Sequence, residues 1–138
     1  MEKRHAHCLC GSVKFAIDKT DHEIGACHCS MCRKWGGGPF MSLHHQGEID
    51  FEGESNITVY KSSVWAERGF CAKCGSSLFY RMEGNQYFLP AGVFEEQDDF
   101  EFSGQIFVDE KPDYYEFSNK TDMKTGQEIF EMFAPKGD

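Results

Sequence analysis

The sequence predicts a mostly-β domain of short antiparallel strands, and two observations support this prediction. Short stretches in which apolar and polar residues alternate recur along the chain, separated by Gly, Asn and Pro turns. Cysteines gather at turn-like positions, where bound metal could hold such strands together. At 138 residues the chain is expected to form a single domain that spans residues 1–138.

The first expected element is a β-hairpin. Residues 3–8 could form a short strand, and residues 12–17 alternate apolar and polar side chains with the period of a half-buried strand. The turn Cys8-Leu9-Cys10-Gly11 lies between these two segments. The pattern therefore places the first two cysteines at the tip of a hairpin.

A single short helical turn is expected over residues 31–35, within and just after the segment Cys27 to Cys32. Ser30 has the side-chain chemistry of an N-cap residue. The run Gly36-Gly37-Gly38-Pro39 would end the helix.

Further strands are expected from residue 40 to residue 90, and a second cysteine-bearing turn, Cys71 to Gly75, lies among them. Beyond residue 94 the alternation weakens. Only residues 127–133 have helical spacing there, with apolar side chains falling on one side. The expected strands cover residues 40–44, 48–52, 57–61, 65–70, 77–81 and 86–90.

Charge and hydropathy exclude several classes of partner. The net charge of −9 arises from an acidic C-terminal part that begins at about residue 95 and carries thirteen acids and four lysines. Nucleic acids and anionic membranes bind basic surfaces, so neither is expected as a partner. No apolar run approaches the ~20 residues of a membrane span, and the first seven residues lack the apolar core of a signal peptide. We therefore expect a cytoplasmic protein, in which clustered thiols stay reduced.

Four of the seven cysteines form two pairs, Cys8 with Cys10 and Cys71 with Cys74. A glycine follows the second cysteine of each pair, and it permits the positive φ of a tight turn. Two such turns brought together would give the Cys₄ set typical of structural zinc. Disulfides and an iron–sulfur cluster are the alternatives.

The other three cysteines, Cys27, Cys29 and Cys32, are spaced CxCxxC and have no fourth cysteine. Zinc prefers four ligands, so such a site could keep a coordination position open for a substrate, and a sulfur-rich zinc suits an incoming thiol. Arg33 and Lys34 follow directly and could bind the carboxylates of a small anionic thiol.

Other readings of this second group stay open. A histidine could close the site, either His28 within the motif or His44 and His45 from the next expected strand. The position of His28 between two ligands makes direct ligation awkward and favours a supporting or surface role. The three thiols could also act in redox chemistry without metal, and the second metal position could be only partly occupied.

These motifs together resemble the glutathione-dependent formaldehyde-activating enzyme family, which also includes centromere protein V. The resemblance covers about residues 5–117, with all seven cysteines in register. The matching segments are Cys8 to Gly11, Cys27 to Lys34, Cys71 to Gly75, Ala91 to Val93, and Ile106 to Val108 leading to Tyr114-Tyr115.

The resemblance implies a β-tent fold, a structural zinc on Cys8, Cys10, Cys71 and Cys74, and a catalytic zinc on Cys27, Cys29 and Cys32. It also implies carbon–sulfur lyase activity, in which glutathione as co-substrate and formaldehyde interconvert with S-(hydroxymethyl)glutathione. The alternative is a non-catalytic zinc module that binds glutathione or a protein partner. The sequence does not indicate an oligomeric state.

Overall fold

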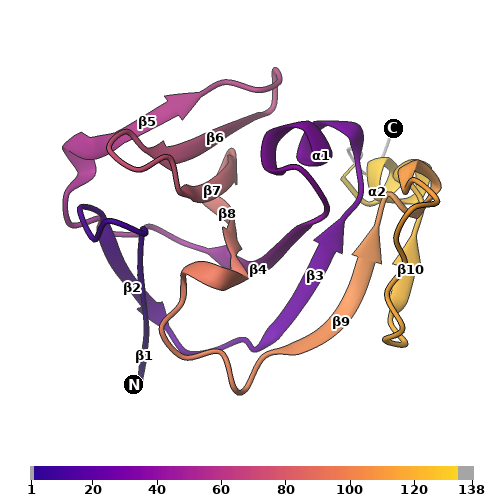
Figure 1. The fold of residues 1–138 in the computed structure, drawn as a ribbon, viewed down its shortest axis with the longest axis horizontal. Helices are drawn as coiled ribbons and strands as arrows, with labels where there is room; N and C mark the ends of the chain where they lie inside the picture. Colours follow the sequence, from indigo (N-terminus) through magenta and orange to yellow (C-terminus); the bar gives the residue numbers. More distant parts are fainter. Residues whose placement is uncertain (1, 134–138) are drawn as a thin grey trace. The chain divides into compact units, whose positions relative to one another are not determined.

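The computed structural model describes residues 2–133 and confirms the mostly-β prediction (Figure 1). The backbone forms two compact units, each made from two stretches of chain. Among the described residues, the first unit contains 2–23 and 42–101, and the second contains 24–41 and 102–133. One group of cysteines lies in each unit.

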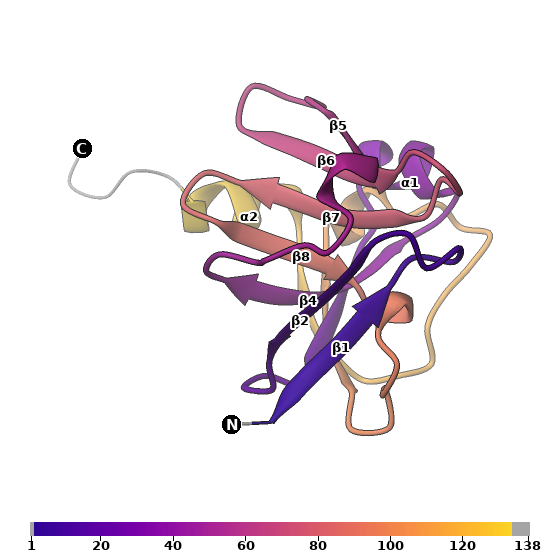
Figure 2. The same cartoon turned by 90° about the vertical axis from the view of Figure 1, so that its left-hand side faces the viewer.

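The first unit begins with the expected hairpin, formed by β1 (Lys3–His7) and β2 (Lys14–Asp18). The strands are antiparallel, with Lys3 opposite Asp18 and His7 opposite Lys14. Figure 2 shows this two-stranded ribbon and the turn that follows β1. That turn carries Cys8 and Cys10, as the sequence predicts.

The same unit contains an antiparallel sheet in the order β4-β8-β7-β6-β5. The strand predictions are confirmed for these five elements, and the turn from Cys71 to Gly75 connects β6 to β7. Short 3₁₀ turns, η1 (Glu54–Asn56) and η2 (Ala91–Val93), flank the sheet strands in the chain. The bounds are β4 (Phe40–Gln46), β5 (Ile57–Tyr60), β6 (Ala66–Cys71), β7 (Ser77–Met82) and β8 (Gln86–Pro90).

The strand predicted over 48–52 is wrong. Only Glu52 pairs, through two backbone hydrogen bonds of 2.8 and 3.0 Å with Lys14. Gly53 then turns the chain with φ of 79°, and a Cβ there would lie 1.9 Å from the carbonyl oxygen of Ser12. This segment instead contributes the Phe51 side chain to the core. The centroids of the Phe51 and Phe15 rings lie 5.2 Å apart.

Aromatic side chains build much of the core of the first unit. Phe79 and Tyr87 are buried and lie 5.6 and 6.2 Å from Phe51, between ring centroids. At the edge of this core Arg4 is also buried, and its guanidinium makes two hydrogen bonds of 2.7 and 2.9 Å to the Asp99 carboxylate. A buried charge paired in this way fixes β1 against a distant part of the chain.

The second unit contains strands in the order β10-β9-β3, none of which the sequence pattern predicts. Their bounds are β3 (Glu23–Cys27), β9 (Glu101–Ile106) and β10 (Asp122–Lys124), and β10 runs parallel to β9. Glycines interrupt the apolar alternation of β3 and β9. They also permit close packing, since a Cβ on Gly25 would lie 3.3 Å from the carbonyl oxygen of Gly104.

Two helices and a short 3₁₀ turn, η3 (Val108–Glu110), complete the second unit. α1 (Ser30–Gly36) begins within the CxCxxC segment and contains the helical turn predicted over 31–35, and its C-cap is Gly37, whose φ is 85°. The expected late helix is confirmed as α2 (Gly126–Phe133). A capping box begins it, with Thr125 Oγ1 accepting from Glu128 N and Glu128 Oε1 accepting from Thr125 N.

Within residues 2–133, neither helix has the length and apolar character that crossing a bilayer requires.

Candidate metal centres

The structure brings Cys8, Cys10, Cys71 and Cys74 together in the first unit, with all four sulfurs within 4.8 Å of one another. The Sγ of Cys10 lies 3.7 Å from that of Cys8 and 3.8 Å from that of Cys71. A tetrahedral zinc with bonds of about 2.3 Å separates its sulfurs by about 3.8 Å, whereas a disulfide bond is about 2.0 Å long. All seven cysteines are free. The donor set and its spacing therefore fit a tetrahedral metal ion.

Tight turns position these sulfurs. Gly11 donates its N–H to Cys8 O at 3.0 Å, and Gly75 donates to Cys71 O at 2.7 Å. Both glycines have positive φ, 79° and 81°, which confirms the backbone role predicted for them. Each cysteine pair thus lies on a tight turn of the same kind, here called a knuckle, formed by residues 8–11 and by residues 71–75.

Sequence reasoning missed the serine that follows each of these glycines. Ser12 Oγ lies 3.2 Å from Cys10 Sγ, and Ser76 Oγ lies 3.2 Å from Cys74 Sγ. The hydrogen bond with Ser76 lowers the pKa of the Cys74 thiol to about 5. Ser76 Oγ also accepts the Leu9 N–H at 3.0 Å, so it links the two knuckles. The repeated Cys-Gly-Ser pattern was the signal available in the sequence.

Replacing Ser76 with alanine is expected to weaken zinc binding by about tenfold to a hundredfold, because it removes a hydrogen bond to a ligand and a link between the knuckles. Competition with a chromogenic chelator would measure the change. Ser62→Ala is the control, since the Ser62 hydroxyl is buried and has no hydrogen-bond partner. Equal zinc affinity in the Ser76 variant and the wild type would show that the serine does not support the site.

The second group consists of Cys27, Cys29 and Cys32 in the second unit, again with all sulfurs within 4.8 Å of one another. Cys27 ends β3, whereas Cys32 lies in the first turn of α1. The expected N-cap is wrong by one residue. Cys29, not Ser30, caps the helix, because its Sγ accepts the Cys32 N–H at 3.4 Å. A sulfur that belongs to the group thus also sets the start of α1.

Hydrogen bonds among the three thiols shift the pKa values of Cys27 and Cys29 in opposite directions. Hydrogen bonds from Cys27 and then Cys32 lower the pKa of Cys29 to about 2, and the bond with Cys29 is the main cause of a raised pKa at Cys27. The group therefore holds a thiolate at neutral pH, and the thiolate is the form that binds metal. Three clustered sulfurs with this character fit a soft divalent ion such as zinc.

Two of the histidines considered as a fourth ligand, His28 and His44, make hydrogen bonds to other side chains. The third, His45, is half-buried in the first unit, and its Nε2 has no hydrogen-bond partner among residues 2–133. His28 is buried, with Nδ1 2.7 Å from Tyr115 Oη and Nε2 2.8 Å from Gln105 Oε1, so the surface alternative is wrong and the supporting role stays a prediction. In the first unit, His44 Nε2 lies 2.6 Å from Gln86 Oε1. Nothing in these contacts supports closure of the three-cysteine group by histidine.

Arg33 and Lys34 lie in the last turn of α1, as their sequence positions require. Arg33 donates its Nε–H to the carbonyl oxygen of His28 at 3.0 Å, which uses one of the five guanidinium donors. Lys34 is exposed. Glu110 Oε1 accepts the Ser30 N–H at 3.0 Å and so holds η3 against the start of the helix. Hydrogen bonds to Glu110 of η3 and to the carbonyl oxygen of His28 thus hold the start of the helix that carries Arg33 and Lys34.

Comparison with known proteins identifies the family of this chain. Residues 3–110 match a family model described as glutathione-dependent formaldehyde-activating enzyme. The chain belongs to this family. The resemblance found in the sequence is therefore confirmed.

Three proteins are similar to this chain to different extents. An uncharacterized lyase of Schizosaccharomyces pombe is 33% identical over 136 residues, which cover 97% of this chain and 99% of the relative. A putative glutathione-dependent formaldehyde-activating enzyme of Halomonas elongata is 30% identical over 81 residues, 52% of each chain. A crystal structure of a Rhodobacter sphaeroides protein has a TM-score of 0.57 at 21% identity, covering 66% of this chain and 87% of that one. That likeness supports the fold alone.

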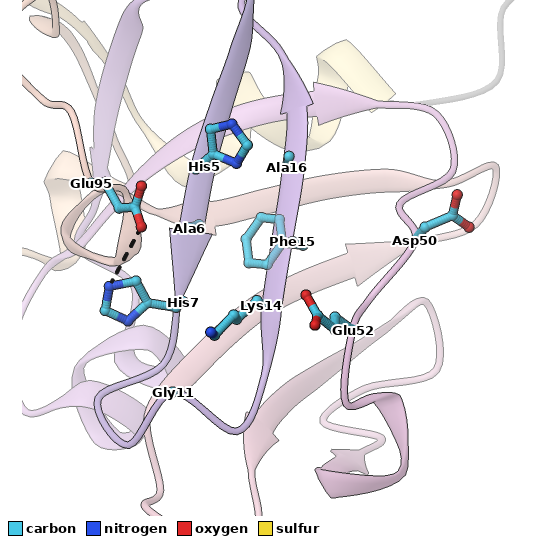
Figure 3. Close-up of a pocket in the computed structure, with 10 residues that line it drawn as sticks. All are labelled: His5, Ala6, His7, Gly11, Lys14, Phe15, Ala16, Asp50, Glu52 and Glu95. Carbon is cyan, nitrogen blue, oxygen red and sulfur yellow. Dashed lines mark ion pairs between the residues drawn. The ribbon is translucent and has the colours of Figure 1, made fainter.

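A separate hollow of about 570 Å³ lies beside the β1–β2 hairpin of the first unit (Figure 3). His5, Lys14 and Glu52 are among its lining residues, and no cysteine is. His7 Nε2 lies 4.0 Å from Glu95 Oε1, the contact drawn as a dashed line. Its exposed, charged lining is typical of a solvated surface, so the family's chemistry is better sought at the cysteines.

Proposed function

We propose that this protein is a zinc-dependent carbon–sulfur lyase that acts on the adduct of a small thiol. The reaction joins the sulfur of glutathione to the carbon of formaldehyde, and its reverse breaks that bond. In the forward direction the thiol loses its proton and the carbonyl oxygen gains one, which gives S-(hydroxymethyl)glutathione with no other reactant. The observation that carries the proposal is a group of three clustered sulfurs without a fourth cysteine, in a chain of this family.

In the second unit, some residues would bind the metal ion and others would bind the thiol substrate. Cys27, Cys29 and Cys32 would hold the ion, and a zinc ion bound there would supply a soft centre that lowers the pKa of an incoming thiol. Arg33 and Lys34 would bind the carboxylates of glutathione, with the Arg33 guanidinium oriented by its bond to His28 O. Holding thiol and aldehyde together in this way lowers the entropic cost of their reaction.

The residues of the first unit would have a structural role. Cys8, Cys10, Cys71 and Cys74 would supply all four ligands of a tetrahedral zinc ion, so an ion bound there would have no vacant position. Such an ion would join the β1–β2 hairpin to the β6–β7 turn. On this proposal the chain binds two zinc ions with different tasks.

Exchange spectroscopy by NMR would test the proposed reaction. With ¹³C-formaldehyde and glutathione at equilibrium, zinc-loaded protein is expected to increase the rate at which label moves between hydrated formaldehyde and the hydroxymethyl thioether. Protein stripped of metal is the matched control. If glutathione binds without any increase in this rate, the chain is a non-catalytic glutathione-binding module, and the lyase proposal is wrong.

A further inference from the structure

His28 is a buried polar residue of the second unit that the proposed chemistry does not use. Its side chain is 0% exposed, although both flanking residues are cysteines of the three-cysteine group. Both ring nitrogens have close partners, Nδ1 with Tyr115 Oη at 2.7 Å and Nε2 with Gln105 Oε1 at 2.8 Å. Short bonds at zero exposure fix the ring, so the direction of each bond can be argued from its partners.

The orientation of the Gln105 amide determines whether His28 Nε2 carries a hydrogen. Its amide nitrogen Nε2 donates to Thr121 Oγ1 at 3.0 Å, which turns the amide oxygen toward His28. An amide oxygen only accepts hydrogen bonds, so His28 Nε2 carries a hydrogen and donates it to Gln105 Oε1. The tautomer of the histidine is therefore set by a side chain 77 positions away in the sequence.

The surroundings of His28 favour a neutral ring. Both hydrogen-bond partners, Gln105 and Tyr115, are neutral groups, and neither is a carboxylate that could stabilise a charged ring. Burial of a ring without such a partner favours its neutral form. A neutral ring with a hydrogen on Nε2 has a lone pair on Nδ1. Tyr115 must then donate its only hydroxyl hydrogen to His28 Nδ1.

Tyr115 is held from several sides but stays only half-buried. Its ring stacks on that of His28, with centroids 5.5 Å apart. Lys111 Nζ donates to the Tyr115 carbonyl oxygen at 2.6 Å and lies 5.2 Å from the ring centroid. Tyr115 Oη lies 2.7 Å from the ring of His28, which stands between Cys27 and Cys29 in the chain, so the hydroxyl is close to the three-cysteine group.

We propose that Tyr115 is a specificity-determining residue of the three-cysteine site, whose hydroxyl oxygen selects a thiol adduct that presents a hydrogen-bond donor. His28 and Gln105 are positioning residues that act through Tyr115. Because its hydrogen is committed to His28, Tyr115 Oη offers only lone pairs to a ligand. This inference rests on the proposed function, since it assumes that a thiol adduct binds at these cysteines.

The reactants and their analogues differ in whether they can donate a hydrogen bond to Tyr115 Oη. The hydroxyl of S-(hydroxymethyl)glutathione can donate to Tyr115 Oη, whereas formaldehyde has no polar hydrogen and S-methylglutathione has no hydroxyl. One neutral hydrogen bond of this kind changes a binding ratio by about threefold to tenfold. The site would therefore hold the adduct more tightly than a thioether of the same shape without the hydroxyl.

The first measurement reads the tautomer without any ligand. A long-range ¹H–¹⁵N correlation spectrum of the zinc-loaded wild-type protein is expected to show a neutral His28 ring protonated at Nε2. In Gln105→Leu the Nε2 proton loses its acceptor, so the Nδ1 tautomer should become populated. A wild-type ring protonated at Nδ1, or at both nitrogens, at neutral pH would overturn the inference whatever the variants do.

The second measurement compares two ligands on three proteins. NMR titration gives the ratio of dissociation constants for S-methylglutathione and for the hydroxymethyl adduct formed in situ. Tyr115→Phe is expected to lower this ratio about threefold to tenfold, while Tyr114→Phe, which alters an exposed neighbouring hydroxyl, should leave it unchanged. An unchanged ratio in Tyr115→Phe, or an equal fall in Tyr114→Phe, would overturn the inference.

Failure of this inference can be told apart from failure of the proposed function. If the wild type speeds exchange of label but Tyr115→Phe keeps the wild-type ratio, only the role of Tyr115 is wrong. If the wild type binds the adduct with a Tyr115-dependent ratio but does not speed exchange, the lyase proposal is wrong and the selectivity stands.

Discussion

Replacing Cys71 with serine is expected to unfold the first unit. Cys71 is fully buried, and its Sγ lies 3.8 Å from that of Cys10, which belongs to the other knuckle. Structural zinc in small domains contributes on the order of 10–16 kcal/mol to folding, whereas a whole domain is stable by about 5–15 kcal/mol. Loss of the ion therefore removes about as much free energy as the fold has. Circular dichroism with thermal unfolding, together with the zinc content, would measure the effect.

Chelation of zinc from the wild type should give the same unfolded state, because it removes the same link. The matched control is Cys29→Ser, which makes the same chemical change at a cysteine of the other group. That variant should keep the melting transition of the first unit. A Cys71→Ser protein that melts like the wild type would contradict a structural role for the four-cysteine group.

The sequence predicts the first unit well because local chemistry decides it. The β1–β2 hairpin and both knuckles follow from period-two alternation and from glycines that take positive φ, and the structure has them at the expected residues. The wrong strand at 48–52 has an apolar residue, Phe51, within a polar stretch. Its ring packs into the core from a segment that pairs at one residue only, and such tertiary packing cannot be read from periodicity.

The second unit is predicted less well because its strands are held by distant partners. β3 and β9 pair across a long stretch of sequence, and glycines at their contact weaken the alternation that marks a strand. The sequence predicts a helical turn at α1, and side-chain propensity favours Ser30 as its cap. Cys29 caps the helix instead, because its backbone is extended and its Sγ accepts the Cys32 N–H. Side-chain propensity ranks serine above cysteine, and the local geometry overrides that preference.

The grouping of the seven cysteines was predictable, but their supporting residues were not. Spacing alone separates the pairs from the triple, and the structure assembles the same two groups. The contact between His28 and Tyr115 joins residues 87 positions apart, and neither residue belongs to a repeating pattern. The assignment of zinc to each cysteine group therefore stays a prediction, as does the role of the three-cysteine group in turnover. The cysteine variants test both.

Replacing Cys29 with serine is expected to remove the metal ion of the second unit and to return label exchange to the rate of a protein-free solution. A serine hydroxyl is a much poorer ligand for zinc than a thiolate. It is, however, a good N-cap, so it can accept the Cys32 N–H as the Cys29 sulfur does. The substitution thus removes a ligand while preserving the start of α1.

Cys29→Ala separates these two roles. It should lose the same metal ion and the same activity, and in addition about 1 kcal/mol of stability, because the cap is lost as well. Native mass spectrometry would count bound zinc, and exchange spectroscopy would measure turnover in the same samples. If Cys29→Ser keeps full turnover with one zinc ion fewer, the reaction does not depend on the three-cysteine group. If both variants keep every zinc ion, Cys29 serves α1 as a cap and is not a ligand.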